Sequence, residues 1–138
     1  MGSPGSSTIR VFAAVVRDDE RYLICQRPLE KRHGGLWEFP GGKFEPGETM
    51  FEAARREMLE ELGVEATEIG DSLLTIADPG SAFVIEFVPT KFRGTPVCLE
   101  HMALSWVPLA NLGAFPLAPS DRRFVEYLLT TSAAASAD

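Results

Sequence analysis

The segment GKFEPGETMFEAARREMLEELGV, residues 42–64, constrains the fold more than any other part of the chain. Thr49 and Glu52 form the pattern of a capping box, and the residues that follow predict a helix over residues 49–62. At about 100° per residue, the acidic and the apolar side chains of this helix fall on different flanks. One flank can therefore pack while the other gathers carboxylates; the acids are Glu57, Glu60 and Glu61, and the apolar residues are Phe51, Ala54, Met58 and Leu62.

The clustered acids of this helix indicate divalent-metal chemistry. Glu57 and Glu61 stand at positions i and i+4, where like charges destabilise an isolated helix by a few tenths of a kcal/mol. Mg²⁺ or Mn²⁺ would remove this repulsion, because hard cations prefer clustered carboxylate oxygens and commonly bridge protein to phosphate. The alternative is a solvated acidic face, which is common on surface helices.

The peptide LWEFPGGK just before the helix favours the metal interpretation. Trp37 and Phe39 alternate with Glu38 as in a strand, and the Pro-Gly-Gly run predicts the end of that strand. Glycines allow the backbone to come close to a ligand, and Lys43 places a positive charge beside them. A strand, a glycine turn and an acidic helix in this order predict a site for an anionic ligand and its metal.

These residues resemble the Nudix box, G-x5-E-x7-R-E-U-x-E-E-x-G-U, where U is a bulky aliphatic residue. Constrained positions at fixed spacing make this resemblance far more specific than a lone glycine motif. It extends over residues 8–129, and the WEFPGGK run is typical of MutT-type nucleoside triphosphate pyrophosphohydrolases. Every constrained position of the box is filled, by Gly42, Glu48, Arg56, Glu57, Met58, Glu60, Glu61, Gly63 and Val64.

The resemblance implies an α/β (α+β) fold, the Nudix α/β/α sandwich with a mixed central sheet. It also implies Mg²⁺- or Mn²⁺-dependent hydrolysis of a nucleoside triphosphate to a monophosphate and pyrophosphate. Glu100 stands before Trp106 with the spacing of a further metal-binding acid of the MutT branch, although it could be an ordinary loop carboxylate. Glu57 and Glu100 are the candidates for the general base. The implied metal ligands are Glu57, Glu60, Glu61 and Glu100, with the carbonyl of Gly42 as a possible addition.

The resemblance also suggests which residues contact the substrate. Arg27 matches an arginine that reaches the phosphates in this branch, and Lys43 is placed to do the same; both could instead be surface charges. Arg56 points about 100° away from the metal face, so we expect it to orient the carboxylates. Phe39 could stack on a base or lie in the core. His101, a lone loop histidine beside Glu100, could contact the base or the metal, but we expect it to be exposed and not catalytic.

The stretch FPLAPSD, which ends at Asp121, bears on base selection. MutT proteins that destroy 8-oxo-dGTP usually carry an asparagine near this position. An ionised aspartate only accepts hydrogen bonds, which favours an exocyclic amine such as cytosine N4. The run resembles the CTP and 5-methyl-dCTP pyrophosphohydrolase branch. Asp121 could also simply cap a helix, and 8-oxo-dGTP stays open as a substrate.

Length and composition limit the remaining possibilities. With 138 residues, the chain suits one domain, which we place at residues 8–130 between flexible segments 1–7 and 131–138. A net charge of −7 argues against a nucleic acid polymer as partner, and no apolar run approaches the ~20 residues of a membrane span. We expect a cytoplasmic monomer or homodimer acting on a small nucleotide, with Cys25 and Cys98 buried in strands as free thiols.

The hydrophobic pattern predicts the order of the elements. A hairpin turn is expected at residues 18–20, and Ser120 or Asp121 would cap the last helix. Two alternatives to the triphosphate activity remain: hydrolysis of a nucleoside diphosphate derivative such as ADP-ribose, and a nucleotide-binding module without catalysis. Strands are predicted at residues 9–17, 21–27, 36–39, 69–77, 82–92 and 103–107, and helices at residues 49–62 and 120–129.

Overall fold

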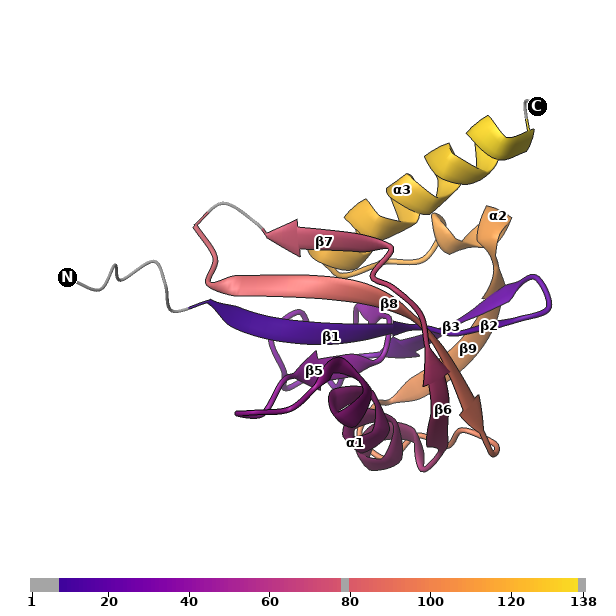
Figure 1. Ribbon diagram of the computed structural model, residues 1–138. Coiled ribbons are helices and arrows are strands. Elements are labelled where there is room, and N and C mark those ends of the chain that lie inside the picture. The colour runs from indigo at the N-terminus through magenta and orange to yellow at the C-terminus, as the bar shows by residue number, and fades with distance from the viewer. Residues whose placement is uncertain (1–7, 78–79, 137–138) are drawn as a thin grey trace.

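The computed structural model describes residues 8–77 and 80–136, in which strands alternate with helices (Figure 1). The predicted flexible segment 1–7 and the last two residues of the predicted tail lie outside the described residues. The elements are β1 (Ile9–Val15), β2 (Arg17–Asp18), β3 (Arg21–Gln26), β4 (Trp37–Glu38), β5 (Gly41–Lys43), α1 (Met50–Leu62), β6 (Glu65–Ile69), β7 (Leu74–Ala77), β8 (Phe83–Arg93), β9 (Ala103–Pro108), α2 (Leu109–Leu112) and α3 (Pro119–Ser136).

The strands form two connected sheets. The first has the order β5-β1-β8-β6, with β7 also paired to β8, and the second has the order β2-β3-β4, with β9 also paired to β3. β1 runs parallel to β8 and antiparallel to β5, so the sheet is mixed as predicted. The predicted hairpin is also present, because β2 pairs antiparallel with β3.

Side chains that alternate along β1 fill two hydrophobic cores on opposite faces of the sheet. Phe12 and Ala14 pack with Met58 of α1, whereas Ala13 and Val15 lie in the core that includes residues of α3. Figure 1 shows α1 and α3 on opposite sides of the strands. The predicted α/β/α sandwich with a mixed sheet is confirmed.

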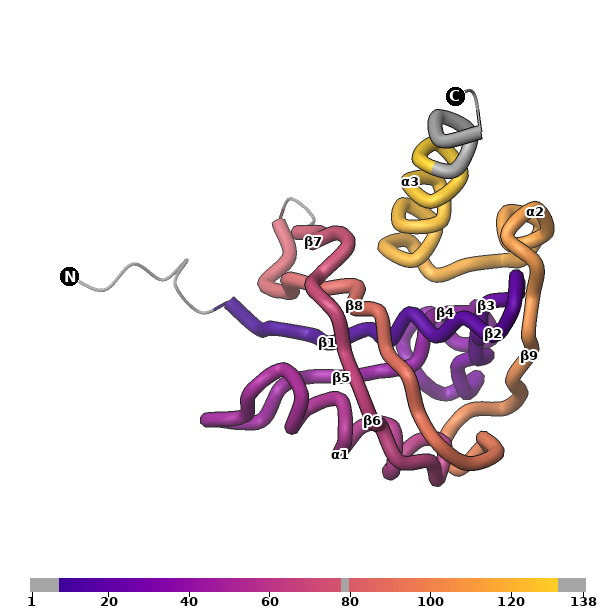
Figure 2. Tube along the Cα trace, turned by 45° about the vertical axis from the view of Figure 1, so that its right-hand side comes forward, coloured from indigo at the N-terminus to yellow at the C-terminus, as the bar shows by residue number. Residues whose placement is uncertain are grey.

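Helix α1 begins and ends as the sequence indicates. Thr49 and Glu52 form the capping box, and Gly63 ends the helix in the left-handed conformation, with φ 68°. The connection from β8 to β9 then runs beside this helix end (Figure 2). Its Val97 and Leu99 N–H groups donate to carbonyls of the last turn, at 3.0 Å each. The helix end is therefore covered by a segment distant in sequence.

Several elements differ from their predicted bounds. The glycines after Pro40 were predicted to end a strand, but they form β5, which pairs with β1. A Cβ at Gly41 would overlap the Phe12 carbonyl, so this close pairing needs glycine. The predicted strand 69–77 contains β7 but only the last residue of β6, and these two strands pair with different parts of β8 on either side of Pro89. Helix α2 was not predicted, and α3 continues past its predicted end to Ser136.

None of the helices in the described part of the chain is both long and apolar enough to cross a membrane.

Candidate active site

Two of the predicted metal-binding glutamates lie side by side against the glycine turn. Glu57 and Glu61 are both buried, at 6% exposure each, on the flank of α1 that faces β5. The Gly41 N–H donates to Glu61 Oε1 at 3.1 Å. A Cβ on Gly42 would overlap the Glu57 carboxylate, so the absence of a side chain there lets the carboxylate approach the backbone.

The electrostatics of this pair favour a bound cation. Burial raises the pKa of Glu61 well above its usual range, and hydrogen bonding and charge repulsion with Glu57 raise it further. The Gly41 N–H lowers the pKa of Glu61 but does not offset these effects. A hard divalent cation would remove the repulsion between the two carboxylates, and the oxygen donors are those that Mg²⁺ prefers. The residues present therefore fit the predicted metal.

Arg56 holds the outer side of this pair in place. Its guanidinium donates to Glu48 at 2.6 and 2.9 Å, to Glu57, and to Glu60 at 3.2 Å. It also donates to the Lys43 carbonyl at 2.9 Å, which joins α1 to β5. The hydrogen bond from Arg56 lowers the pKa of Glu48 to about 2. The prediction that Arg56 orients the carboxylates is confirmed.

The other two predicted metal ligands lie further outward. The Glu60 side chain is 48% exposed and contacts Arg56, and Glu100 is exposed in the β8–β9 connection. Within residues 8–77 and 80–136, no three Asp, Glu, His or Cys side chains are arranged so that they could hold a metal ion. The structure thus brings Glu57 and Glu61 together, whereas the parts of Glu60 and Glu100 in metal binding stay predictions.

A second charged group lies on the strand side of the pair. Arg27 Nη1 bonds Glu38 Oε1 at 2.8 Å, and the Arg27 Nε–H donates to the Arg32 carbonyl at 2.6 Å. The other Glu38 oxygen lies 2.9 Å from His101 Nε2. Arg27, predicted to contact phosphates, is therefore tied to a carboxylate of β4.

His101 corrects an expectation from the sequence. We expected an exposed loop histidine, but its side chain is only 4% exposed. Its Nδ1 atom lies 3.8 Å from Glu61 Oε1, so the ring stands between Glu38 and Glu61. A lone histidine carries no periodic pattern, and the one available signal was its place directly after Glu100 and ahead of the last strand.

Phe39 and Asp121 join β4 to the start of α3. The Phe39 N–H donates to Asp121 Oδ1 at 2.9 Å. The Phe39 ring is 3% exposed and packs edge-on against Phe87 and Phe124. Its alternative role as a core residue is therefore confirmed, and this burial argues against the predicted stacking on a base.

The environment of Asp121 changes the argument about base selection. Burial, followed by the nearby charge of Glu38, raises the pKa of Asp121 to about 8, against a lowering by the Phe39 N–H. The raised pKa favours the neutral carboxyl near neutral pH, whereas the role of Asp121 in base selection stays a prediction. A protonated carboxyl offers one hydrogen-bond donor as well as acceptors.

The remaining predicted residues divide between surface and interior. Lys43 is exposed, with its Nζ 5.6 Å from the centre of the Phe83 ring. Cys25 is a buried free thiol as expected, and burial raises its pKa. Cys98 is also free but exposed in the β8–β9 connection, so its predicted burial in a strand was wrong.

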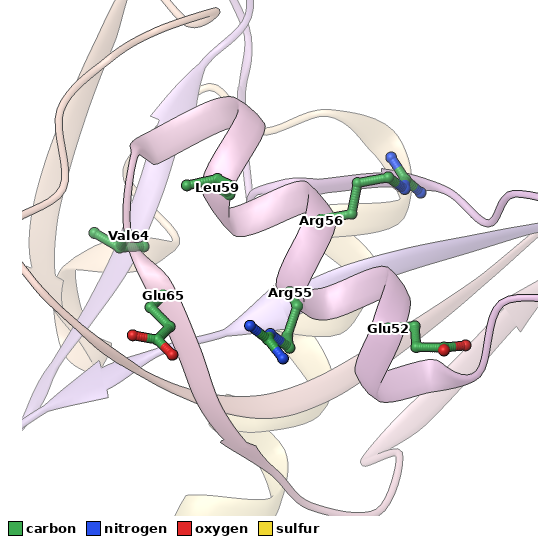
Figure 3. Close-up of a pocket in the computed structure, with 6 residues that line it drawn as sticks. All are labelled: Glu52, Arg55, Arg56, Leu59, Val64 and Glu65. Atoms are coloured by element: carbon green, nitrogen blue, oxygen red, sulfur yellow. The ribbon is translucent and has the colours of Figure 1, made fainter.

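A separate hollow of about 410 Å³ lies between α1 and β6 (Figure 3). Arg55 points toward Glu65 in this view, and Leu59 is 62% exposed. Neither Glu57 nor Glu61 lines it, so it lies on the other flank of the helix from the carboxylate pair. Its lining residues are Glu52, Arg55, Arg56, Leu59, Val64 and Glu65.

Comparison with known proteins agrees with this geometry. The family model described as NUDIX domain matches residues 7–128. The CTP pyrophosphohydrolase of Escherichia coli (strain K12) is 40% identical over 134 residues, covering 94% of this chain and 98% of that protein. The putative 8-oxo-dGTP diphosphatase 2 of Mycobacterium tuberculosis (strain ATCC 25618 / H37Rv) is 35% identical over 133 residues, covering 94% of each. A solved MutT structure, from work on the Aliivibrio salmonicida and Vibrio cholerae proteins, has a TM-score of 0.77 at 29% identity, covering 90% of this chain and 98% of that one. The chain therefore belongs to the Nudix family and is a MutT-like Nudix hydrolase.

Proposed function

We propose that this protein is a Mg²⁺-dependent pyrophosphohydrolase of nucleoside triphosphates. The observation that carries the proposal is the buried pair Glu57 and Glu61, held against the glycine backbone of β5. These two carboxylates would hold the metal with the Gly42 carbonyl, and Glu60 and Glu100 would complete the predicted set. Bound there, the metal neutralises phosphate charge and makes water more acidic.

The protein side chains supply the remaining requirements of the reaction. Water attacks a phosphorus of the triphosphate, a phosphorus–oxygen bond forms, and the anhydride bond to the departing pyrophosphate breaks. The proton of the water passes to a carboxylate, for which Glu57 and Glu100 stay the candidates. Lys43 and Arg27 would offset charge on the phosphates. Arg56 acts by holding Glu57, which it contacts directly.

The protonated form of Asp121 suggests which bases are accepted. Cytosine presents its N4 amine, a donor, beside N3, an acceptor, and a neutral carboxyl complements that pair. 8-Oxoguanine presents N7–H beside O6 and has the same order, because oxidation at C8 turns N7 into a donor. On the same edge, guanine presents two acceptors, N7 and O6, so a carboxyl that meets this edge matches guanine less well than 8-oxoguanine. We therefore expect cytosine nucleotides and 8-oxo-dGTP to be preferred over dGTP.

A hydrolysis panel tests this proposal. CTP, dCTP, 5-methyl-dCTP, 8-oxo-dGTP and dGTP are supplied at equal low concentration with Mg²⁺, and monophosphate and pyrophosphate are both quantified. Release of pyrophosphate in proportion to monophosphate supports the reaction, and the ranking against dGTP tests the role of Asp121. Absence of pyrophosphate from every triphosphate would refute the proposal and direct the search to diphosphate derivatives such as ADP-ribose.

A further inference from the structure

His101 is held in place by backbone contacts on both sides. Before it, the Leu99 N–H donates to the Glu61 carbonyl at 3.0 Å; after it, the Met102 N–H donates to the Gln26 carbonyl at 2.9 Å. The first contact fixes the β8–β9 connection to the end of α1, and the second fixes it to β3. The imidazole therefore occupies a defined position between these two elements, consistent with its burial.

The two ring nitrogens of His101 face two different carboxylates. Nε2 lies 2.9 Å from Glu38 Oε2, and because an ionised carboxylate only accepts, Nε2–H is the donor. Nδ1 faces Glu61 Oε1 at 3.8 Å, which is too long for a hydrogen bond. This Nδ1 is a buried polar atom without a hydrogen-bond partner among the described residues. Buried polar atoms are rarely left so, and those that are call for an explanation in terms of function or strain.

The Glu38 side of this arrangement lies near the proposed base reader. Glu38 also binds Arg27, and β4 leads directly into Phe39, whose N–H bonds Asp121. The Glu61 side belongs to the carboxylate pair of α1. His101 thus lies against both Glu61, on the proposed metal-binding side, and Glu38, on the proposed nucleotide-binding side.

We propose that His101 is a positioning residue that holds Glu61 and Glu38 in a fixed relation, so that metal and nucleotide are presented to each other correctly. This inference rests on the proposed function. On the Nδ1 side, the ring packs against Glu61 Oε1 at 3.8 Å and limits where that carboxylate can lie, so its effect falls on metal binding and on the hydrolytic step. Nε2 acts through Glu38 and Arg27 on nucleotide binding. If the role of His101 were merely structural, its substitution would weaken metal binding and nucleotide binding together, in proportion to the loss of stability.

Three substitutions at one position separate the two nitrogens. His101→Gln keeps an amide nitrogen near the place of Nε2, toward Glu38. His101→Asn keeps one near the place of Nδ1, toward Glu61, and His101→Phe keeps the ring shape with neither. The matched control is His33→Asn, because His33 is exposed and asparagine tolerates its positive φ of 60°. The full chain is used throughout.

The expected result is a split between kcat and KM. We expect His101→Phe to lower kcat about 10–100-fold and to raise KM, as for other groups that support a metal ligand. His101→Gln should keep KM near that of the parent but lose kcat, and His101→Asn should do the opposite. Affinity for Mn²⁺ alone, followed by electron paramagnetic resonance without nucleotide, should fall about 10–100-fold in the Phe and Gln variants and less in the Asn variant.

Two outcomes would overturn the inference. One is an unchanged Mn²⁺ affinity in a folded His101→Phe or His101→Gln variant. The other is that kcat falls and KM rises equally in the Gln and Asn variants, in proportion to their loss of melting temperature. That result would leave His101 a structural role only. Because Mn²⁺ binding needs no turnover, the inference is tested even if the parent hydrolyses no triphosphate, an outcome that counts against the proposed function instead.

Discussion

Two groups of charged side chains lie on either side of Glu57, and they differ in how their charges are balanced. The Arg56 cluster consists of Arg56 with Glu48, Glu57 and Glu60; one guanidinium satisfies several carboxylates, and the pKa of Glu48 falls. The His101 cluster consists of His101 with Glu38, Glu61, Arg27 and Asp121; it is more deeply buried, and the pKa values of Glu61 and Asp121 rise. The pKa of a carboxyl group is therefore raised where burial dominates and lowered where a paired cation dominates.

This difference suggests a division of roles. Arg56 already bonds every carboxylate of its cluster, so the Arg56 cluster fixes the shape of α1 and β5 and holds Glu57 in place for the metal. A cluster of buried acids with raised pKa values gains much from a cation or a hydrogen-bonding base, and such perturbed groups are typical of functional sites. The predictions below test this division.

The largest effect is expected from Glu61→Gln. The amide cannot supply the negative charge for a metal, so kcat should fall by more than the 10–100-fold typical of groups that only support a ligand. Because a buried acid with a raised pKa costs stability at neutral pH, the variant should melt at the same or a higher temperature. Mg²⁺-dependent pyrophosphate release and thermal unfolding, measured together, check both points.

Glu68→Gln is the matched control, because Glu68 is exposed on β6 and outside both clusters. It should leave activity and melting temperature unchanged. A Glu61→Gln variant as active as the parent would show that the metal site is wrongly assigned.

Arg56→Lys should have a smaller effect, with a different signature. Lysine keeps the charge but cannot contact Glu48, Glu57 and the Lys43 carbonyl together, as the planar guanidinium does. We expect the free energy of unfolding to fall by about 2 kcal/mol and kcat to fall about 10-fold or more, because Glu57 loses its support. Urea unfolding and steady-state kinetics are the measurements.

Arg55→Lys is the control for Arg56→Lys, because the Arg55 side chain is exposed and lines the hollow between α1 and β6. It should be neutral in both assays. Equal behaviour of the two lysine variants would mean that the Arg56 cluster contributes no more than an ordinary surface charge.

The two clusters also differ in how far the sequence predicts them. The hydrogen-bond partners of Arg56 lie within residues 43–60, on α1, on β5 and in the loop between them. Helical geometry and motif spacing were therefore sufficient to predict its role. The His101 cluster combines Arg27, which directly follows β3, with side chains from β4, α1, the β8–β9 connection and α3, and no local pattern records such an arrangement. Its burial, and with it the raised pKa of Asp121, depends on tertiary packing.

The fold follows the same rule. The capping box, the hairpin and the alternating strands were predicted from local pattern, whereas the α/β/α sandwich came from the family resemblance. β5 was missed because its glycines read as a turn, although Gly41 is required by the close approach of β1. β6 and β7 pair with different parts of the distant strand β8, and a local pattern does not record where one pairing ends and the next begins.

The smallest effect on activity at neutral pH is expected from Asp121→Asn, whose effect on stability depends on pH. The pKa of Asp121 is about 8 in the folded protein, above its ordinary value near 4, so the folded state keeps a proton that the unfolded chain loses. The parent should therefore lose stability relative to the Asn variant as pH rises from about 4 to about 8, by at most about 1.4 kcal/mol per pH unit, and the difference should then level off. Chemical unfolding of both proteins across this range measures it.

Nucleotide binding gives the matching functional test. The asparagine carries a donor and an acceptor at every pH and can still accept from the Phe39 N–H, so its KM for a cytosine nucleotide should stay nearly constant. The parent ionises above about pH 8 and loses the donor, so its KM should rise there by several-fold relative to the variant. Parallel KM profiles for the two proteins, together with a constant stability difference, would show that Asp121 is already ionised at neutral pH. In that case Glu61 would be the one acid of the His101 cluster with a raised pKa, and residues other than Asp121 would set the preference for a base.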